Sequence, residues 1–407
     1  MLVAERLLFG IVAFWAQAAS GLDISGPWSS FIVRDGGFAS AVLAPWQRGD
    51  SLWYQRIAEN GYTVGERSVT YSPLYPLLTR IVSGPFAETV VWGQFLVSSA
   101  AFVVALRLLY ELARLEGSRP DDPLAHRRGL FSVLFLALFP SGFFLLAPFS
   151  ESLFLSLTMG AIWLARRERW LAAGGAGFLA SLAHTNGIAL VFPLAWELAA
   201  QHRLWQWVRG RGGSWPGWRT VSAAAPALGA VAWVLYASQV VGGRPTLLGD
   251  ALRGRGIVPE EAGVVSRGWR WSPPWENLGA SLEYVLGTSG AARPVSPGDT
   301  LDALRAVEAL NLVGLLAFVA LGVLVIRWLP IAYGLSLWPN LAVLLSRRLS
   351  AQPLESTNRL LLELFPCFLV LAMMAAPRIK LAIPALAASG TLEVLLLIRF
   401  VQWRFVA

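Results

Sequence analysis

Charged residues are scarce in this chain, since they make up 14% of 407 residues while 56% are hydrophobic. Ordinary soluble domains carry roughly a quarter charged residues. Apolar runs long enough to cross a bilayer recur along nearly the whole chain, so we expect the excess to be buried in lipid. A separate soluble catalytic domain therefore has no place, and the composition predicts one all-α integral membrane domain over residues 1–407.

Cysteine is almost missing as well. Cys367, the single cysteine, lies inside an apolar run, which excludes disulfides and a cysteine-based metal site. We find no convincing internal repeat, no low-complexity tract and no glycine-rich phosphate loop of the nucleotide-binding kind. A soluble nucleotide-sugar donor is therefore not suggested.

The formal net charge of +8 comes from basic residues in short clusters between apolar segments. Such clusters are typical of topology signals, whereas a nucleic-acid-binding protein gathers them on one polar face, so we expect no nucleic-acid partner. We place all of these clusters in the cytoplasm. They contain Arg114, Arg119, Arg127 and Arg128; Arg166, Arg167 and Arg169; Arg203, Arg209, Arg211 and Arg219; and Arg378 and Lys380.

About eleven segments are predicted to enter or cross the membrane, several of them shorter than a full crossing. They are residues 4–20, 87–110, 129–148, 150–165, 171–184, 187–200, 220–241, 304–326, 330–346, 359–376 and 381–399. The first is interpreted as a retained helix, because it lacks a strong basic start and a clear signal-peptide cleavage site. Two large loops then lie outside the cytoplasm, at 21–86 and 241–302, and we expect them to cover the active site.

The orientation requires residues 171–200 to enter the membrane and return, turning at His184, Thr185, Asn186 and Gly187. Non-helical backbone at membrane depth is tolerated only against protein or a water-filled cavity. The turn is therefore predicted to form a cavity wall.

The sequence of the first exterior loop predicts a helix that begins near Asp50 and stops before Gly61. Helical spacing places Asp50, Trp53, Tyr54 and Ile57 on one face. Such a helix would lie along the membrane interface and hold a carboxylate at the water boundary. The same features also fit a helix that Asp50 merely caps and Gly61 ends, without any chemistry.

Several motifs resemble those of the PIG-V-like mannosyltransferases, a branch of the GT-C superfamily. The strongest are Arg48-Gly49-Asp50-Ser51-Leu52-Trp53-Tyr54 with Ile57-Ala58 and Gly61-Tyr62, then Tyr71-Ser72-Pro73-Leu74-Tyr75-Pro76-Leu77, Phe139-Pro140-Ser141-Gly142-Phe143-Phe144, Ser150-Glu151-Ser152-Leu153-Phe154 and Thr185-Asn186-Gly187. Weaker ones are Gly268-Trp269-Arg270 with Pro273-Pro274-Trp275, and Asn358-Arg359-Leu360-Leu361 with Phe365-Pro366. The chain departs from these relatives at Gly49, where tryptophan is usual, and at His184, where arginine is more usual.

The resemblance implies a GT-C type helical bundle with interfacial helices in the first exterior loop. It also implies inverting transfer of a hexose, usually mannose, from a polyprenyl-phosphate sugar to an acceptor hydroxyl outside the cytoplasm. Attack by a hydroxyl requires a base, and Asp50 is our candidate. The phosphate leaving group requires cationic stabilisation, for which the planar guanidinium of Arg359 is suited. Arg270, Arg48 and His184 are weaker alternatives, and Arg359 would also fit an interfacial anchor.

The remaining candidates would bind substrate. Glu151 could hold the acceptor, support a divalent cation together with Asp50, or only be a first-turn acid in a helix capped by Ser150. Metal dependence is left open, since one or two carboxylates would hold only a partly hydrated Mg²⁺ or Mn²⁺. Trp53, Tyr54 and Asn186 complete the set, although most tryptophans of membrane proteins simply lie at the interface.

Two other functions are compatible with these residues. A transporter or flippase of a lipid-linked substrate would also carry polar residues in the membrane, although such proteins often show internal repeats. A noncatalytic envelope-assembly protein would tolerate the departures at Gly49 and His184. The richness in Ala, Arg, Gly and Trp is typical of a high-GC bacterium, so we expect a multi-pass plasma-membrane protein with its site facing outward. The acceptor, whether a glycolipid, a polymer or a protein, is not identified.

Overall fold

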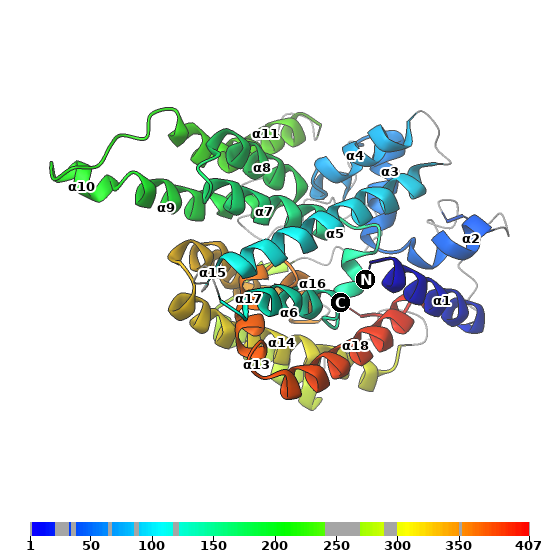
Figure 1. The fold of residues 1–407 in the computed structure, drawn as a ribbon. Helices are drawn as coiled ribbons and strands as arrows, with labels where there is room; N and C mark the ends of the chain where they lie inside the picture. Colours follow the sequence, from blue (N-terminus) through cyan, green and yellow to red (C-terminus); the bar gives the residue numbers. More distant parts are fainter. Residues whose placement is uncertain are drawn as a thin grey trace.

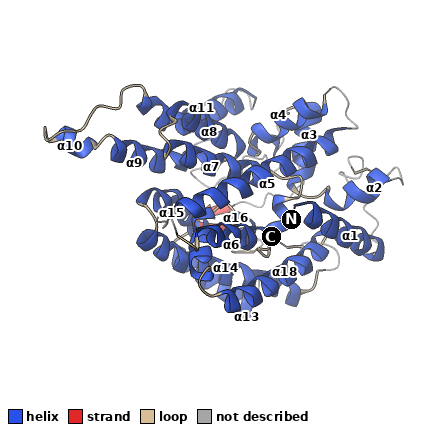
Figure 2. Cartoon of the chain, in the orientation of Figure 1, coloured by secondary structure: helices blue, strands red, loops and turns tan. Residues whose placement is uncertain are grey.

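The computed structural model of the chain is built almost entirely of helices in the residues it describes, which confirms the all-α class (Figures 1 and 2). The described residues are 2–20, 32–33, 38–63, 67–84, 89–116, 122–240, 269–288, 299–349 and 352–406. Within them the only sheet is one antiparallel pair, β1 (Trp269–Trp271) with β2 (Arg347–Leu349). The pair attaches the second large loop to the end of a membrane helix.

Each segment predicted to enter the membrane contains a helix. These are α1 (Leu2–Ser20), α5 (Val90–Leu115), α6 (Ala125–Ala137), α7 (Glu151–Ala165), α8 (Trp170–Ala183), α9 (Val191–Gln201), α11 (Arg219–Val240), α14 (Leu301–Trp328), α15 (Ile331–Ser346), α17 (Phe365–Ala375) and α18 (Ile379–Val401). In the described part of the chain, four of them, α5, α11, α14 and α18, are long and apolar enough to cross a membrane. These four helices indicate a membrane protein. The total of eleven segments stays a prediction.

The segment expected over 129–148 is not one helix. α6 ends at Ala137, and after a turn the chain forms a short 3₁₀ helix, η5 (Gly142–Leu145). Pro140 explains the break, because proline has no N–H for the helix ladder and disfavours helical backbone in the residue before it. The predicted segment therefore contains a helix, a turn and a 3₁₀ helix, and the break carries the Phe139–Phe144 motif as a turn inside the bundle.

The first large loop folds into short helices: α2 (Phe38–Leu43), η2 (Ala44–Trp46), α3 (Asp50–Asn60), η3 (Arg67–Thr70) and α4 (Leu74–Ser83). α3 has the predicted bounds, and its C-terminus is closed by the N–H of Gly61, which bonds to the Ile57 carbonyl. α4 buries Tyr75 while it exposes Leu77 and Ile81. An exposed apolar face on a short helix is typical of the membrane interface.

The turn predicted at residues 184–187 separates α8 from α9 and continues as η6 (Thr185–Leu190). It folds back tightly, because a Cβ on Gly187 would lie 2.6 Å from the Cα of Ser181. Glycine is required at this close approach. The turn packs against α8 and α11, so its backbone is covered by protein as expected for irregular structure at this depth.

The two ends of the chain meet, since α1 packs along α18 (Figure 1). Between α9 and α11 the chain forms α10 (Leu204–Val208), and α13 (Pro274–Leu286) follows β1. The short helix α16 (Thr357–Leu361) packs against α14. The first turns of α3, α7 and α16 are the elements that carry the polar cluster described next.

Candidate active site

One guanidinium joins two carboxylates from distant parts of the chain. Nη1 of Arg359 lies 2.7 Å from Oδ2 of Asp50, and its Nε lies 3.1 Å from Oε1 of Glu151. The Glu151 side chain is buried, whereas those of Asp50 and Arg359 keep 28% and 19% of their surface exposed. Three predicted site residues therefore meet, and the base candidate can be reached from outside.

Local structure explains where the acids lie. Asp50 and Glu151 are the first residues of α3 and α7, where the partial positive charge of a helix N-terminus favours a carboxylate. The turn before α3 has Gly49 at φ +52° and ψ −125°, a backbone conformation that residues with a side chain rarely adopt. The departure from relatives at Gly49 thus coincides with the turn that directs Asp50 into the cluster.

Burial and charge act on Arg359 in opposite directions. Burial alone would lower its pKa, but the carboxylates of Asp50 and Glu151 outweigh this effect and hold the pKa above its ordinary value. The arginine therefore stays a cation at any physiological pH, as the binding of a phosphate requires.

Aromatic side chains form one wall beside Asp50. The Tyr71 hydroxyl donates to Oδ1 of Asp50 at 3.2 Å, and its ring stacks on Trp53 with centroids 5.6 Å apart. Tyr54 lies edge-on to Tyr71, and its hydroxyl is 2.8 Å from Oγ of Ser150, the residue before Glu151. Flat aromatic faces next to a polar cluster offer the stacking surface that a sugar ring uses.

His184 and Asn186 both contact Glu363, an acid that sequence reasoning did not select. Nδ2 of Asn186 donates to Oε2 of Glu363 at 3.2 Å, and Nε2 of His184 lies 3.7 Å from Oε1 of the same residue. The His184 ring packs 5.2 Å from Phe154, one turn along α7 from Glu151. The turn at 184–187 therefore forms a second wall of the site.

Hydrogen bonding fixes the tautomer of His184. The backbone N–H of Asn186 donates to Nδ1 of His184, which leaves the ring proton on Nε2, the nitrogen that faces Glu363. Glu363 itself lies in the turn before α17.

Buried polar groups of α14 hold the backbone that carries Arg359. Oε1 of Glu308 accepts from the N–H of Leu354, and Oδ1 of Asn311 accepts from the N–H of Asn358, each at 3.1 Å. The Ser141 hydroxyl, from the turn after α6, donates to the Asn358 carbonyl at 2.8 Å. Because Asn358 directly precedes Arg359, these bonds fix the position of the guanidinium.

The structure does not bring Arg48 to the cluster. The guanidinium of Arg48 is buried between Phe400 and Trp403, 4.6 Å and 4.8 Å from their ring centroids. This burial lowers the pKa of Arg48 to about 9, although Asp299 opposes the effect. Arg48 thus packs the C-terminal segment against the loop. Arg270 lies in β1, and its side chain lies outside the described part of the chain.

Sequence reasoning missed Tyr71, Glu363, Glu308 and Asn311 as members or supports of the site. Tyr71 was visible inside a matching motif, but nothing in the motif assigns its hydroxyl to Asp50. Glu363 had a usable signal, because an acid in an otherwise apolar run is costly in a membrane and commonly functional.

Among the residues that the structure describes, no group of three or more His, Cys, Asp or Glu side chains is placed to hold a metal ion. The two acids suggested as ligands, Asp50 and Glu151, are both paired with Arg359, which lies between them. The guanidinium takes the position of a cation shared by the two carboxylates, so the described donor set does not fit a divalent ion, and we derive no step through one.

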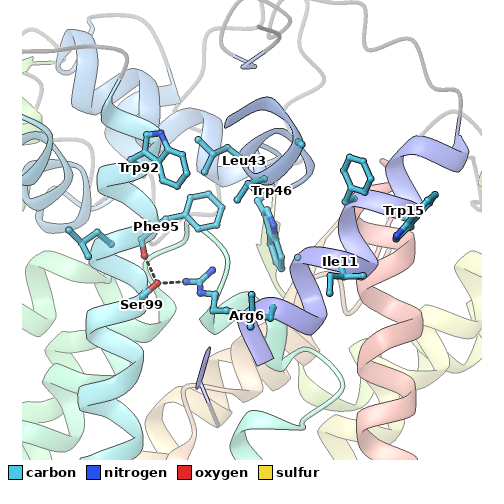
Figure 3. Close-up of a pocket in the computed structure, with 14 residues that line it drawn as sticks. Arg6, Ile11, Trp15, Leu43, Trp46, Trp92, Phe95 and Ser99 are labelled. Atoms are coloured by element: carbon cyan, nitrogen blue, oxygen red, sulfur yellow. Dashed lines mark hydrogen bonds between the residues drawn. The ribbon is translucent and has the colours of Figure 1, made fainter. Parts of the chain in front are cut away.

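A separate apolar groove of about 760 Å³ lies between α1, α2, η2 and α5 (Figure 3). Arg6 donates to Ser99 at its edge, at 2.5 Å, and Trp46 forms part of its wall. Trp46 also packs on Phe400, and Phe400 packs on Phe144 under the Arg359 guanidinium. A continuous aromatic contact therefore connects the groove with the polar cluster.

Comparison with known protein families gives a match to the family described as mannosyltransferase (PIG-V), over residues 16–202. The matched range contains Asp50, Glu151, His184 and Asn186, whereas Arg359 and Glu363 lie beyond it. No curated protein and no solved structure matches the chain. Asp50 and Glu151 thus both lie within the matched range.

Proposed function

The chain belongs to the PIG-V-like family of mannosyltransferases and is a glycosyltransferase, and from this we propose that it moves mannose from a polyprenyl-phosphate sugar to an acceptor hydroxyl outside the cytoplasm. The observation that carries the proposal is the pairing of Arg359 with Asp50 and Glu151. A base and a phosphate-binding cation are the two groups that such a transfer needs, and they lie in contact.

The proposed reaction is a single displacement with inversion. The acceptor oxygen attacks the anomeric carbon, and its proton passes to the carboxylate of Asp50 as the new bond forms. The bond from the anomeric carbon to the phosphate oxygen breaks on the opposite face. The phosphate leaves with the bonding electron pair, and the guanidinium of Arg359 stabilises its added negative charge.

Donor binding would rearrange the ion pairs. A guanidinium has five N–H donors in one plane and binds phosphate through two parallel hydrogen bonds. When the donor phosphate enters, we expect Arg359 to turn donors away from Asp50. The carboxylate then regains a free oxygen for the acceptor proton, while Tyr71 continues to orient it.

The apolar groove of Figure 3 supports a lipid-linked donor. It is lined mainly by apolar side chains of α1 and α5, and the ring contacts of Trp46, Phe400 and Phe144 connect it to Arg359. A hydrocarbon chain gains by entering such a surface, at about 25 cal/mol for each Å² of apolar area removed from water. We therefore assign the groove to the polyprenyl chain and Trp53 with Tyr71 to the sugar.

The test is a transfer assay with membranes that contain the protein, radiolabelled polyprenyl-phosphate mannose and a crude acceptor extract. Wild-type protein should label the extract and Asp50→Asn should not. Glu59→Gln is the matched control, because Glu59 lies in the same helix and bonds to Gln55 away from the cluster. Labelling that survives Asp50→Asn would exclude the mechanism, and labelling only by another lipid-linked sugar would exclude mannose.

A further inference from the structure

A hairpin between α9 and α11 extends past the other helix ends, at the left of Figure 1. It comprises residues 202–219 with the short helix α10, and we call it the 202–219 hairpin. Four arginines lie in it, namely Arg203, Arg209, Arg211 and Arg219. The sequence has no acidic residue from Leu198 through Val240, and the acid that precedes this range, Glu197, lies in α9, so the hairpin itself is purely basic.

The hairpin is folded rather than extended. The N–H of Ser214 donates to the His202 carbonyl at 3.0 Å, and the N–H of Arg211 donates to the Gln206 carbonyl at 2.8 Å. The His202 ring lies between the Ser214 hydroxyl at 2.7 Å and Nη1 of Arg219 at 3.0 Å. These bonds close both ends of the loop, so its side chains are presented in a fixed arrangement.

Large apolar side chains cover the outside of this folded loop. Trp205, Trp207, Trp215 and Trp218 have exposed fractions between 45% and 66%, and Val208 is 70% exposed. Such a concentration of exposed apolar side chains marks an interaction surface. Tryptophan with arginine is also the combination found where a protein meets lipid head groups, because the indole has an apolar body and a polar N–H.

The 202–219 hairpin lies where a membrane-crossing helix begins. α11 begins at Arg219 and is long and apolar enough to cross a membrane, so Trp218 and Trp215 lie at its entry. Trp207 packs on Trp215 with ring centroids 5.4 Å apart, which places α10 beside the same entry. A bilayer surface therefore lies next to the exposed tryptophans.

We propose that the 202–219 hairpin binds anionic phospholipid head groups on the side of the membrane where α11 begins, independently of the transfer reaction. The tryptophans lie in the head-group layer and the arginines pair with lipid phosphates. Because no acid accompanies the arginines, the surface distinguishes anionic from zwitterionic lipid, which attracts basic segments much less.

The test uses an introduced cysteine, because the single native cysteine of the chain is buried. Cys367 is buried in α17, so a fluorophore on Val208→Cys reports the hairpin, and the labelled wild-type protein gives the background. The labelled protein is placed in nanodiscs of phosphatidylcholine alone or with added phosphatidylglycerol, and acrylamide quenching is measured. We expect the anionic lipid to lower the quenching constant about threefold or more, since several arginines act together near an anionic surface.

Two controls separate lipid binding from other effects. Leu286→Cys, in α13 and 67% exposed, should give the same quenching in both bilayers. Replacing Arg203, Arg209 and Arg211 by glutamine should abolish the lipid response at Val208→Cys, while Arg219 is kept because it bonds to His202. Equal quenching in both bilayers with the arginines intact would overturn the proposal. The exposed tryptophans would then be assigned to the binding of a protein partner.

Discussion

The guanidinium of Arg359 lies 2.7 Å from the carboxylate of Asp50, and the two residues come from opposite ends of the chain. The same guanidinium also contacts Glu151, with its Nε 3.1 Å from Oε1. One cation on α16 thus links the first turns of α3 and α7 before any substrate is bound. A site assembled in this way can exchange carboxylate for phosphate at one arginine, and this exchange is the basis of the proposed mechanism.

Arg359→Lys keeps the positive charge and removes the planar fork. Lysine would hold the carboxylates but would bind phosphate at one point only. Because hydrogen bonds to charged groups contribute about 1.5 to 3 kcal/mol, kcat/KM for mannosyl transfer should fall roughly 10- to 100-fold. Steady-state kinetics with the lipid-linked donor measures this. Arg80→Lys is the matched control, because Arg80 bonds to the backbone carbonyls of Ala58 and Glu59 at the end of α3. Unchanged kinetics in Arg359→Lys would contradict the assignment.

Much of the fold was predictable because its signals are local. Apolar runs marked the membrane helices, and Asp50 with Gly61 marked both ends of α3. The contact between Asp50 and Arg359 was not predictable from spacing, since no local pattern reports which helix ends meet. Arg48 shows the same limit, because its place in the motif favoured the site whereas packing on Phe400 turns it away.

Tyr71→Phe removes one hydrogen bond to the proposed base and keeps the ring that stacks on Trp53. The net contribution of one hydrogen bond is about 0.5 to 1.5 kcal/mol, so kcat should fall roughly three- to tenfold. Tyr75→Phe is the matched control, because its hydroxyl bonds to Gln94 and Ser98 and not to Asp50. An equal loss in both variants would show that the effect is general destabilisation.

Asn311→Ala tests the support beneath Arg359. The substitution leaves the N–H of Asn358 buried without its partner, which costs about 1 to 3 kcal/mol. We expect a lower thermal midpoint and a higher KM for the donor, because Arg359 loses its fixed position. Asn340→Ala provides the control, since Asn340 bonds only to Ser336 of its own helix. A purely structural role would lower the midpoint of Asn311→Ala without changing its KM.

The central claim is that Asp50 takes the acceptor proton while Arg359 holds the phosphate, and the purified Asp50→Asn variant in nanodiscs tests it most directly. Asparagine keeps the size of the side chain and cannot act as the base. Turnover and donor affinity should be measured on the same sample. We predict that kcat falls roughly 10²- to 10⁴-fold, the usual contribution of general base catalysis, while the variant still binds the donor. A variant that binds the donor and turns over within about tenfold of wild type, less than such a base contributes, would contradict the claim.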